Sequence, residues 1–249
     1  MESTEKYSLF YCPEDGKLHI GDACTEENEA LVGNMGEKIY QSENYHGEGK
    51  NLTLSDFHFQ TTADIALIVP DGSTVILEGK NELKVVNDRE RANAAVLYSN
   101  GSMTITGGAE AELRCLAETS QGLWSRCICA RFGNLSIEGG TIYAIAGSAG
   151  KCGAIYAGGR FREVPDTGRI RIRGGKILAS AKTNAIRASA GKLFLEPPKN
   201  YCSVVNNARE YTGSSLSWNG ETLTQEKMDK PVMILFEPEP VVSGTGRTI

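Results

Sequence analysis

The sequence lacks the features that mark membrane-spanning and secretory precursor chains. Its 249 residues contain no apolar run near the roughly 20 residues that a membrane-spanning helix needs. The first residues, MESTEKYSLF, contain no apolar signal core, so we expect a chain that is cytosolic or already processed. A net charge of −5 disfavours broad binding to nucleic acid.

The cysteines offer no recognisable metal site. Seven cysteines are present, none of them in a Cys-x-x-Cys pair, and only three histidines accompany them. Zinc sites commonly use such pairs, so we expect neither a metal nor a cofactor. We expect the thiols to be reduced and to fill small positions in and around the repeats described next.

The chain does contain an internal repeat, which is clearest between Gly133 and Lys192. The stretch LSIEGGTIYA matches IRIRGGKILA, and GAIYAGG matches NAIRASAG. An apolar–x–apolar triplet occurs six times, at Leu52–Leu54, Val75–Leu77, Met103–Ile105, Leu135–Ile137, Ile170–Ile172 and Leu193–Leu195. Repeats of this length are typical of solenoids and propellers, and the alternation has the period of a strand. A unit of about 23 residues holds roughly three short strands, which favours one coil of a parallel β-helix over a propeller blade.

Glycine pairs at the ends of the triplets and an aliphatic–x–Ala element carry a family resemblance. The pairs are Gly107-Gly108, Gly139-Gly140 and Gly174-Gly175. From about Asn51 to Pro197 the chain resembles the right-handed parallel β-helix proteins, the architecture of pectate lyases. More narrowly, it is similar to glycine-rich repeat proteins of gut bacteria described as carbohydrate-binding domain-containing. The resemblance implies an all-β, single-stranded right-handed solenoid, a carbohydrate ligand and an extracellular or cell-surface location.

The repeats indicate one elongated domain with three parts. We expect an N-terminal cap with a β-hairpin at 1–50, about six coils at 51–198, and a C-terminal cap and tail at 199–249. The hairpin would turn at Pro13, Asp15 and Gly16. A short helix at Thr25–Val32 and a second hairpin at Leu216–Thr224 are also predicted.

Strand alternation predicts which side chains face inward. The second element of the units would place Leu67, Val96, Ile128, Ile155 and Ile186 in one interior column. The next residues would face outward as Ile68, Leu97, Cys129, Tyr156 and Arg187. A stripe this apolar is unusual on a monomer surface, so we expect residues 1–50, the C-terminal segment or a second subunit to cover it. Self-association would then use Ile68, Leu97 and Tyr156. A second outward column, with Glu138, Arg173 and Glu196, should form a ladder of alternating charge.

Three connections before the second element predict a binding corner. They span residues 87–93, 117–126 and 147–152, and they would bring five residues together: Arg89, Arg91, Trp124, Arg126 and Lys151. Tyr156 and Arg187 would lie on the adjoining face. Aromatic rings stack on sugars, and guanidinium groups bind carboxylates or sulfates. We therefore expect an anionic glycan as ligand, although Arg89 could instead pair within its own charged run and Trp124 could simply anchor its loop.

The motifs of the pectin-cleaving β-helix enzymes are missing. Those enzymes use paired aspartates with Gly-His-Gly and Arg-Ile-Lys, or calcium-binding aspartates with a catalytic arginine near a proline. Here Arg171-Ile172-Arg173 is a weak match to Arg-Ile-Lys, and neither Gly-His-Gly nor an Asp-Asp pair occurs in the repeat region. A non-catalytic glycan-binding module is therefore the favoured function, with a structural or protein-interaction scaffold as the alternative. A polysaccharide lyase or glycoside hydrolase is the least favoured.

Overall fold

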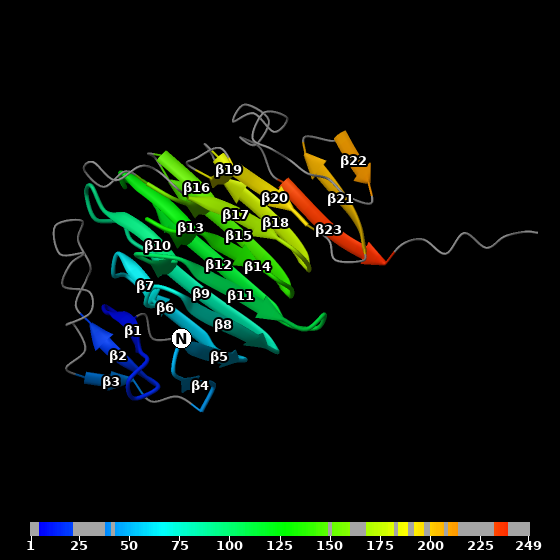
Figure 1. Cartoon of the computed structure of the whole chain (residues 1–249). Helices are drawn as coiled ribbons and strands as arrows, with labels where there is room; N and C mark the ends of the chain where they lie inside the picture. The colour runs from blue at the N-terminus through cyan, green and yellow to red at the C-terminus, as the bar shows by residue number, and fades with distance from the viewer. Residues whose placement is uncertain are drawn as a thin grey trace, which may run out of the picture.

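The described residues form strands and no helix. The computed structural model describes residues 5–21, 38–40, 43–148, 151–159, 168–181, 184–188, 192–196, 200–206, 209–213 and 232–238. In these ranges the chain is all-β, and its 23 strands form three sheets (Figure 1). The helix predicted at Thr25–Val32 and the hairpin predicted at Leu216–Thr224 lie outside the described residues.

Sheet I contains the second element of each repeat. Its strand order is β19-β16-β13-β10-β7-β1-β2-β3. The strands are β1 (Ser8–Cys12), β2 (Lys17–Gly21), β3 (Lys38–Tyr40), β7 (Ile65–Ile68), β10 (Asn93–Ser99), β13 (Trp124–Ala130), β16 (Lys151–Ala157) and β19 (Asn184–Ala188). From β1 to β19 the neighbours are parallel, whereas β1, β2 and β3 pair antiparallel at one end.

Sheet II contains the apolar–x–apolar triplets. Its order is β20-β17-β14-β11-β8-β5-β4, and only the terminal β4–β5 pair is antiparallel. The strands are β4 (Tyr45–Glu48), β5 (Asn51–Ser55), β8 (Ser73–Glu78), β11 (Met103–Gly107), β14 (Leu135–Ile137), β17 (Arg169–Ile172) and β20 (Lys192–Leu195).

Sheet III completes each repeat. Its order is β22-β21-β23-β18-β15-β12-β9-β6. The strands are β6 (His58–Thr61), β9 (Lys80–Val86), β12 (Glu112–Thr119), β15 (Thr141–Ser148), β18 (Lys176–Ala181), β21 (Asn200–Asn206), β22 (Arg209–Gly213) and β23 (Val232–Pro238). The C-terminal strands β21, β22 and β23 join this sheet in antiparallel pairs.

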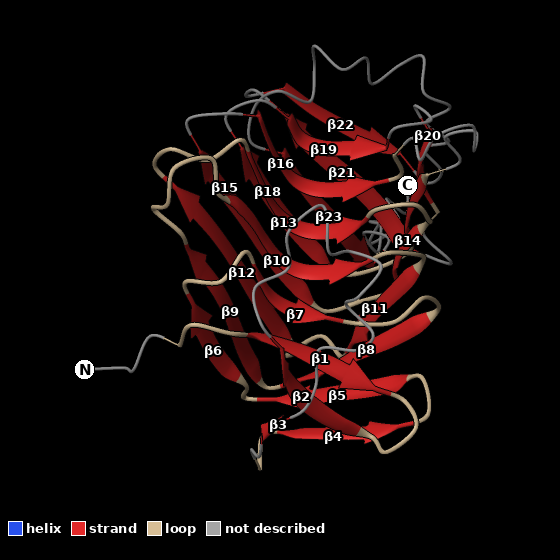
Figure 2. Ribbon diagram, turned by 90° about the vertical axis from the view of Figure 1, so that its left-hand side faces the viewer, coloured by secondary structure: helices blue, strands red, loops and turns tan. Residues whose placement is uncertain are grey.

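The chain visits the three sheets in a fixed cycle from β7 to β20. Up to β17, each strand in this stretch pairs in parallel with the strand three places further along, as β7 with β10 and β8 with β11. Figure 2 shows the resulting layers from the side, with β7, β10, β13, β16 and β19 stacked in order. The sequence repeats because every layer must offer the same inward-facing positions to its neighbours.

The core is built from aligned aliphatic columns. In sheet II one column contains Leu52, Val75, Ile105, Ile137, Ile172 and Leu195, none more than 2% exposed. In sheet III another contains Phe59, Leu83, Cys115, Ala144 and Ala179. Cys115, Cys127, Cys129 and Cys152 are buried and form no disulfide, in agreement with the expected use of thiols as small filling groups.

The register corrects two of the predicted alignments. In sheet I, Leu97 and not Val96 pairs with Leu67 and Ile128. Val96 is still buried, because two successive residues of β10 face the core, so the inward–outward alternation of side chains fails there. In sheet II, Val75 pairs with Ile105 rather than with Met103. A shift of two residues keeps the same side chains inward, so the apolar pattern alone does not exclude it.

The glycine pairs of the repeat have distinct roles at the corners. Gly175 has a φ of +91°, which an L side chain rarely adopts, and a Cβ added there would lie 2.2 Å from the Gly140 carbonyl oxygen. Gly174 has an ordinary φ, but an added Cβ would lie 2.5 Å from the carbonyl oxygen of Glu138. Successive layers therefore touch through backbone at this corner, and both positions exclude a side chain.

The predicted ladder of alternating charge is present on the outside of the corner. Arg173 Nη1 lies 3.2 Å from Glu138 Oε1, and Arg173 Nε lies 3.2 Å from Glu196 Oε2. Since all three side chains are at least a quarter exposed, these pairs contribute little to stability.

Candidate functional site

The outer face of sheet I contains a second apolar cluster, separate from the main core. Its buried members are Ile65, Ile68, Ala95, Tyr98 and Cys129, and Phe10, Trp124 and Tyr156 pack against them. The predicted outward stripe is therefore correct at Ile68, Cys129 and Tyr156. It is wrong at Leu97, which lies in the main core, and Tyr98 takes that outward position beside Ile68.

Four of the predicted site residues lie together on this face and form what we call the arginine–aromatic ladder: Trp124, Arg126, Tyr156 and Arg187. The guanidinium carbon of Arg126 lies 4.6 Å from the centre of the Trp124 ring and 4.0 Å from the centre of the Tyr156 ring. Arg187 continues the series, with its guanidinium carbon 6.0 Å from the Tyr156 ring centre. The order across the face is thus aromatic, cation, aromatic, cation.

Small neighbours in the sheet make room for the Arg126 side chain. Arg126 pairs with Ala95 on one side and with Gly153 on the other. Tyr156 pairs with Cys129 and with Arg187, so its ring lies one layer above a small thiol. The parallel register therefore explains how residues from three repeats come to stack.

Arg126 also contacts a thiol of the apolar cluster. Arg126 Nη1 lies 3.5 Å from Cys129 Sγ. Burial acts to lower the pKa of Arg126, but the neighbouring Cys129 and Tyr156 oppose this effect, and the pKa is raised overall. Burial also raises the pKa of the Cys129 thiol, and Arg126 offsets part of that rise. Arg126 therefore remains a cation and Cys129 remains a neutral thiol.

The charge of the ladder is not neutralised by an acid in the described part of the chain. Among the described residues, no carboxylate forms an ion pair with Arg126 or Arg187. Other arginines do have such partners: Arg114 pairs with Glu112 at 2.5 Å, and Arg173 pairs with two glutamates. In a protein of net charge −5, the ladder is a local concentration of positive charge on aromatic groups.

The remaining predicted site residues are not part of this ladder. Arg89 Nη2 pairs with Asp64 Oδ1 at 2.5 Å, and Arg89 Nε donates to Asn87 Oδ1 at 3.1 Å. Arg91 is exposed in the same connection, where its backbone N–H donates to the Gln121 carbonyl at 3.2 Å. The backbone of Lys151 pairs with Trp124, and its side chain lies outside the described part of the structure.

Arg89 instead lines an open groove. The groove has a volume of about 690 Å³, and its lining residues are Lys6, Gln60, Thr62, Ala63, Val86, Asn87, Asp88 and Arg89. Next to it lies Asp64, a buried carboxylate that also accepts a hydrogen bond of 2.7 Å from Asn87 Nδ2. Burial raises the pKa of Asp64, and the Arg89 charge offsets part of that rise. Sequence reading missed Asp64 because no motif links it to a residue 25 positions away.

Comparisons with known proteins name no relative. No protein-family model, curated protein or solved structure matches the chain. The described residues also include no helix with the length and apolar character to cross a membrane.

Proposed function

We propose that the chain is a right-handed parallel β-helix of about six coils that binds anionic carbohydrate through the arginine–aromatic ladder. In this proposal, residues 51–198 form the coils, and 1–50 and 199–249 cap them. The cyclic visit to three sheets supports the coil assignment. The antiparallel strands at both ends support the assignment of caps, which open solenoids require.

The observation that carries the ligand class is the stacking of Arg126 between Trp124 and Tyr156 without a carboxylate partner among the described residues. Stacking engages the faces of a guanidinium group, while its N–H donors lie in the plane and suit a carboxylate or sulfate. The neighbouring rings suit the apolar face of a sugar. One ligand that satisfies both requirements is an acidic polysaccharide.

The carboxylates that follow the strands of sheet II, Glu138 and Glu196, favour a role in binding glycans over a role in hydrolysing them. Two-carboxylate glycosidases need an acid and a base or nucleophile that flank the bond to be cleaved. Glu138 and Glu196 are both engaged by Arg173, which lies between them. We therefore propose a non-catalytic module, with lyase or hydrolase activity as the alternative that a turnover assay tests.

A glycan array with acidic and neutral polysaccharides tests the proposal. Wild-type protein should bind acidic glycans, and binding should weaken with added salt as the charges are screened. The Trp124→Ala, Arg126→Ala double variant should lose this binding. Arg126→Lys should also weaken it, since lysine keeps the charge but loses the planar stacking group.

A matched control exists outside the ladder. Arg114 stacks on Tyr143 with a guanidinium-to-ring distance of 5.3 Å, but it is paired with Glu112. The Arg114→Ala, Tyr143→Ala variant should therefore bind like wild type. Binding that survives removal of Trp124 and Arg126 would exclude the ladder as the site. Turnover of polygalacturonate would establish an enzyme instead.

A protein-interaction scaffold is the second candidate, favoured by the apolar cluster on the same face. Of the residues first expected to mediate self-association, Ile68 is 2% exposed and Leu97 is in the core, so only Tyr156 remains partly accessible. Leu123 is more accessible, at 53%. Light scattering at increasing concentration tests this candidate: self-association that Leu123→Glu and Tyr156→Glu abolish supports it, and a monomer at all concentrations excludes the homo-oligomer.

A further inference from the structure

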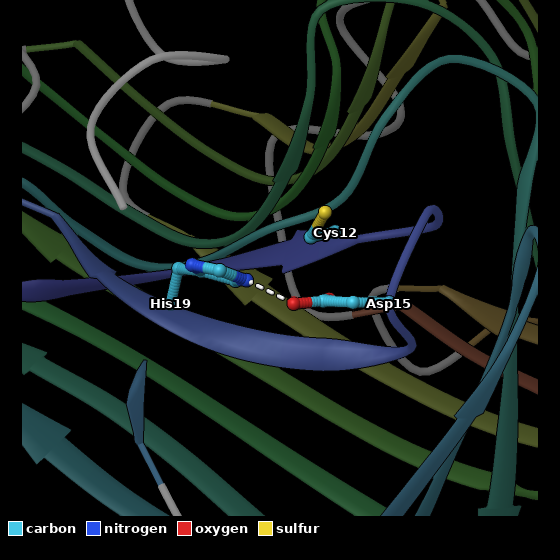
Figure 3. Close-up of side chains that lie close together, drawn as sticks. All are labelled: Cys12, Asp15 and His19. Carbon is cyan, nitrogen blue, oxygen red and sulfur yellow. Dashed lines mark hydrogen bonds and ion pairs between the residues drawn. The ribbon is translucent and has the colours of Figure 1, made fainter. Parts of the chain in front are cut away.

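Three potential metal ligands of different chemistry meet at the first hairpin. One ligand atom each from Cys12, Asp15 and His19 lies within 4.8 Å of the other two. His19 Nε2 and Asp15 Oδ2 are 2.9 Å apart. Figure 3 shows the His19 ring directed at the Asp15 carboxylate, with Cys12 on the adjoining strand. The cluster is far in sequence from the arginine–aromatic ladder and does not depend on its function.

The hairpin holds these side chains on a fixed frame. Cys12 ends β1 and His19 lies in β2, where it pairs with Phe10, so Cys12 and His19 extend from the same face. The opposite face is anchored by three fully buried residues, Leu9, Tyr11 and Leu18. The Tyr11 hydroxyl also lies 2.6 Å from the Gly49 carbonyl oxygen, which ties the hairpin to the connection before β5.

The turn itself positions Asp15. The Gly16 N–H donates to the Cys12 carbonyl at 2.9 Å, and the Lys17 N–H donates to Asp15 Oδ1 at 3.0 Å. Gly16 adopts a φ of +68°, and an added Cβ would lie 2.3 Å from the Gly47 carbonyl oxygen. Backbone geometry therefore holds one Asp15 oxygen, while the other is the one that faces His19.

We propose that Cys12, Asp15 and His19 bind a zinc-class divalent transition metal ion. Sulfur, nitrogen and oxygen donors together suit zinc and its neighbours and do not suit calcium or magnesium, which prefer oxygen alone. Bonds of about 2.0–2.3 Å to one ion imply donor separations of roughly 3–4 Å, so the cluster needs only small adjustments. Three protein ligands leave a fourth position for water or an external ligand.

Binding requires one defined proton release. The Cys12 thiol now donates to Glu14 Oε2 over 3.0 Å. When the sulfur binds the metal, this proton leaves to solvent and the thiolate becomes the ligand. His19 binds through Nε2 as the neutral tautomer that carries its proton on Nδ1, so the proton that Nε2 now donates to Asp15 Oδ2 is transferred through solvent to Nδ1.

Calorimetric titration of the full-length, chelator-treated protein with zinc chloride tests the site, together with absorption spectra of the cobalt(II) form. We expect one tightly bound ion per chain and a thiolate-to-cobalt charge-transfer band. Cys12→Ser should abolish that band, and His19→Gln and Asp15→Asn should each weaken zinc binding by at least the 10–100-fold that changes next to metal ligands cost.

Two exposed histidines outside the cluster, His46 and His58, provide matched controls. His46→Ala and His58→Ala should bind zinc like wild type. All five variants change residues that are at least partly exposed, and circular dichroism should confirm that each stays folded. Absence of zinc and cobalt binding would overturn the proposal, and so would binding that is equally tight after Cys12→Ser and His19→Gln.

Discussion

Ile128 on β13 and Ile155 on β16 pair in register, and neither side chain is exposed to solvent. Shortening one member of such a column leaves a cavity that a rigid stack of strands fills poorly. We expect Ile155→Ala to lower the free energy of unfolding by about 2–5 kcal/mol, as measured by urea denaturation. Ile145→Ala on β15 is the matched control, because Ile145 is 43% exposed, and its effect should be far smaller. Equal effects of the two substitutions would contradict the assignment of the core.

The corner glycines differ in what they tolerate. Gly175 combines a positive φ with a close backbone contact, so Gly175→Ala should destabilise the protein by about 1–3 kcal/mol or more. Gly108 belongs to an equivalent pair in the sequence, but an added Cβ there meets no atom within 4 Å. Gly108→Ala should therefore be neutral or mildly stabilising. Urea denaturation of both variants measures the difference, and a stable Gly175→Ala variant would show that the corner adjusts.

Asp64 should make stability depend on pH. Its pKa in the folded protein is raised by burial, so the folded state binds more protons than the unfolded state above the ordinary aspartate pKa. The contribution of Asp64 to stability is therefore greatest at low pH and falls as pH rises through the raised pKa. Asp64→Asn should remove this slope from urea denaturation measured over that range. Asp88→Asn, in an exposed position of the neighbouring connection, should leave the slope unchanged.

The thiols should differ in reactivity. Burial raises the pKa of Cys115, Cys127 and Cys129, which suppresses the reactive thiolate as well as access to it. Burial and the hydrogen bond to Glu14 also raise the pKa of Cys12, but its side chain is partly exposed, so access distinguishes it from the buried thiols. In a background with Cys24 and Cys202 changed to serine, a thiol reagent should modify one cysteine in the folded protein, and Cys12→Ser should abolish that reaction. Rapid modification of several thiols without denaturant would contradict this expectation.

The all-β, mostly parallel architecture could be predicted because the same apolar positions and glycine pairs recur in every layer. Apolar alternation identified the inward side chains at Leu67, Ile128 and Ile155, and the glycine pairs identified a corner. Alternation could not identify the register at Val96, since two successive residues there face inward. Nor could it distinguish Met103 from Ile105 as the partner of Val75, because a shift of two preserves the pattern.

The sites were predictable only where the repeat brings residues together. Trp124, Arg126, Tyr156 and Arg187 meet because they occupy aligned strands, which repeat spacing reveals. Arg89 was misplaced because its partner Asp64 lies on a different strand connection and no local pattern links them. The Cys12 cluster could not be recognised from cysteine spacing because it contains a single cysteine and no Cys-x-x-Cys pair. The predicted hairpin could have indicated this cluster, since antiparallel pairing across a short turn brings Cys12 near His19.

The cycle of strands through three sheets has a consequence for how the molecule opens. From β8 to β17 each strand pairs, among the described residues, only with strands of the layers directly before and after it, so a middle layer is held on both sides and an outer one less completely. Local opening should then begin near the ends of the stack and advance inward one layer at a time. Native-state hydrogen exchange should accordingly be slowest for the amides of β12 and β13 and become faster toward β19 and β20. Unfolding would therefore proceed by the successive loss of terminal layers while the middle layers remain paired.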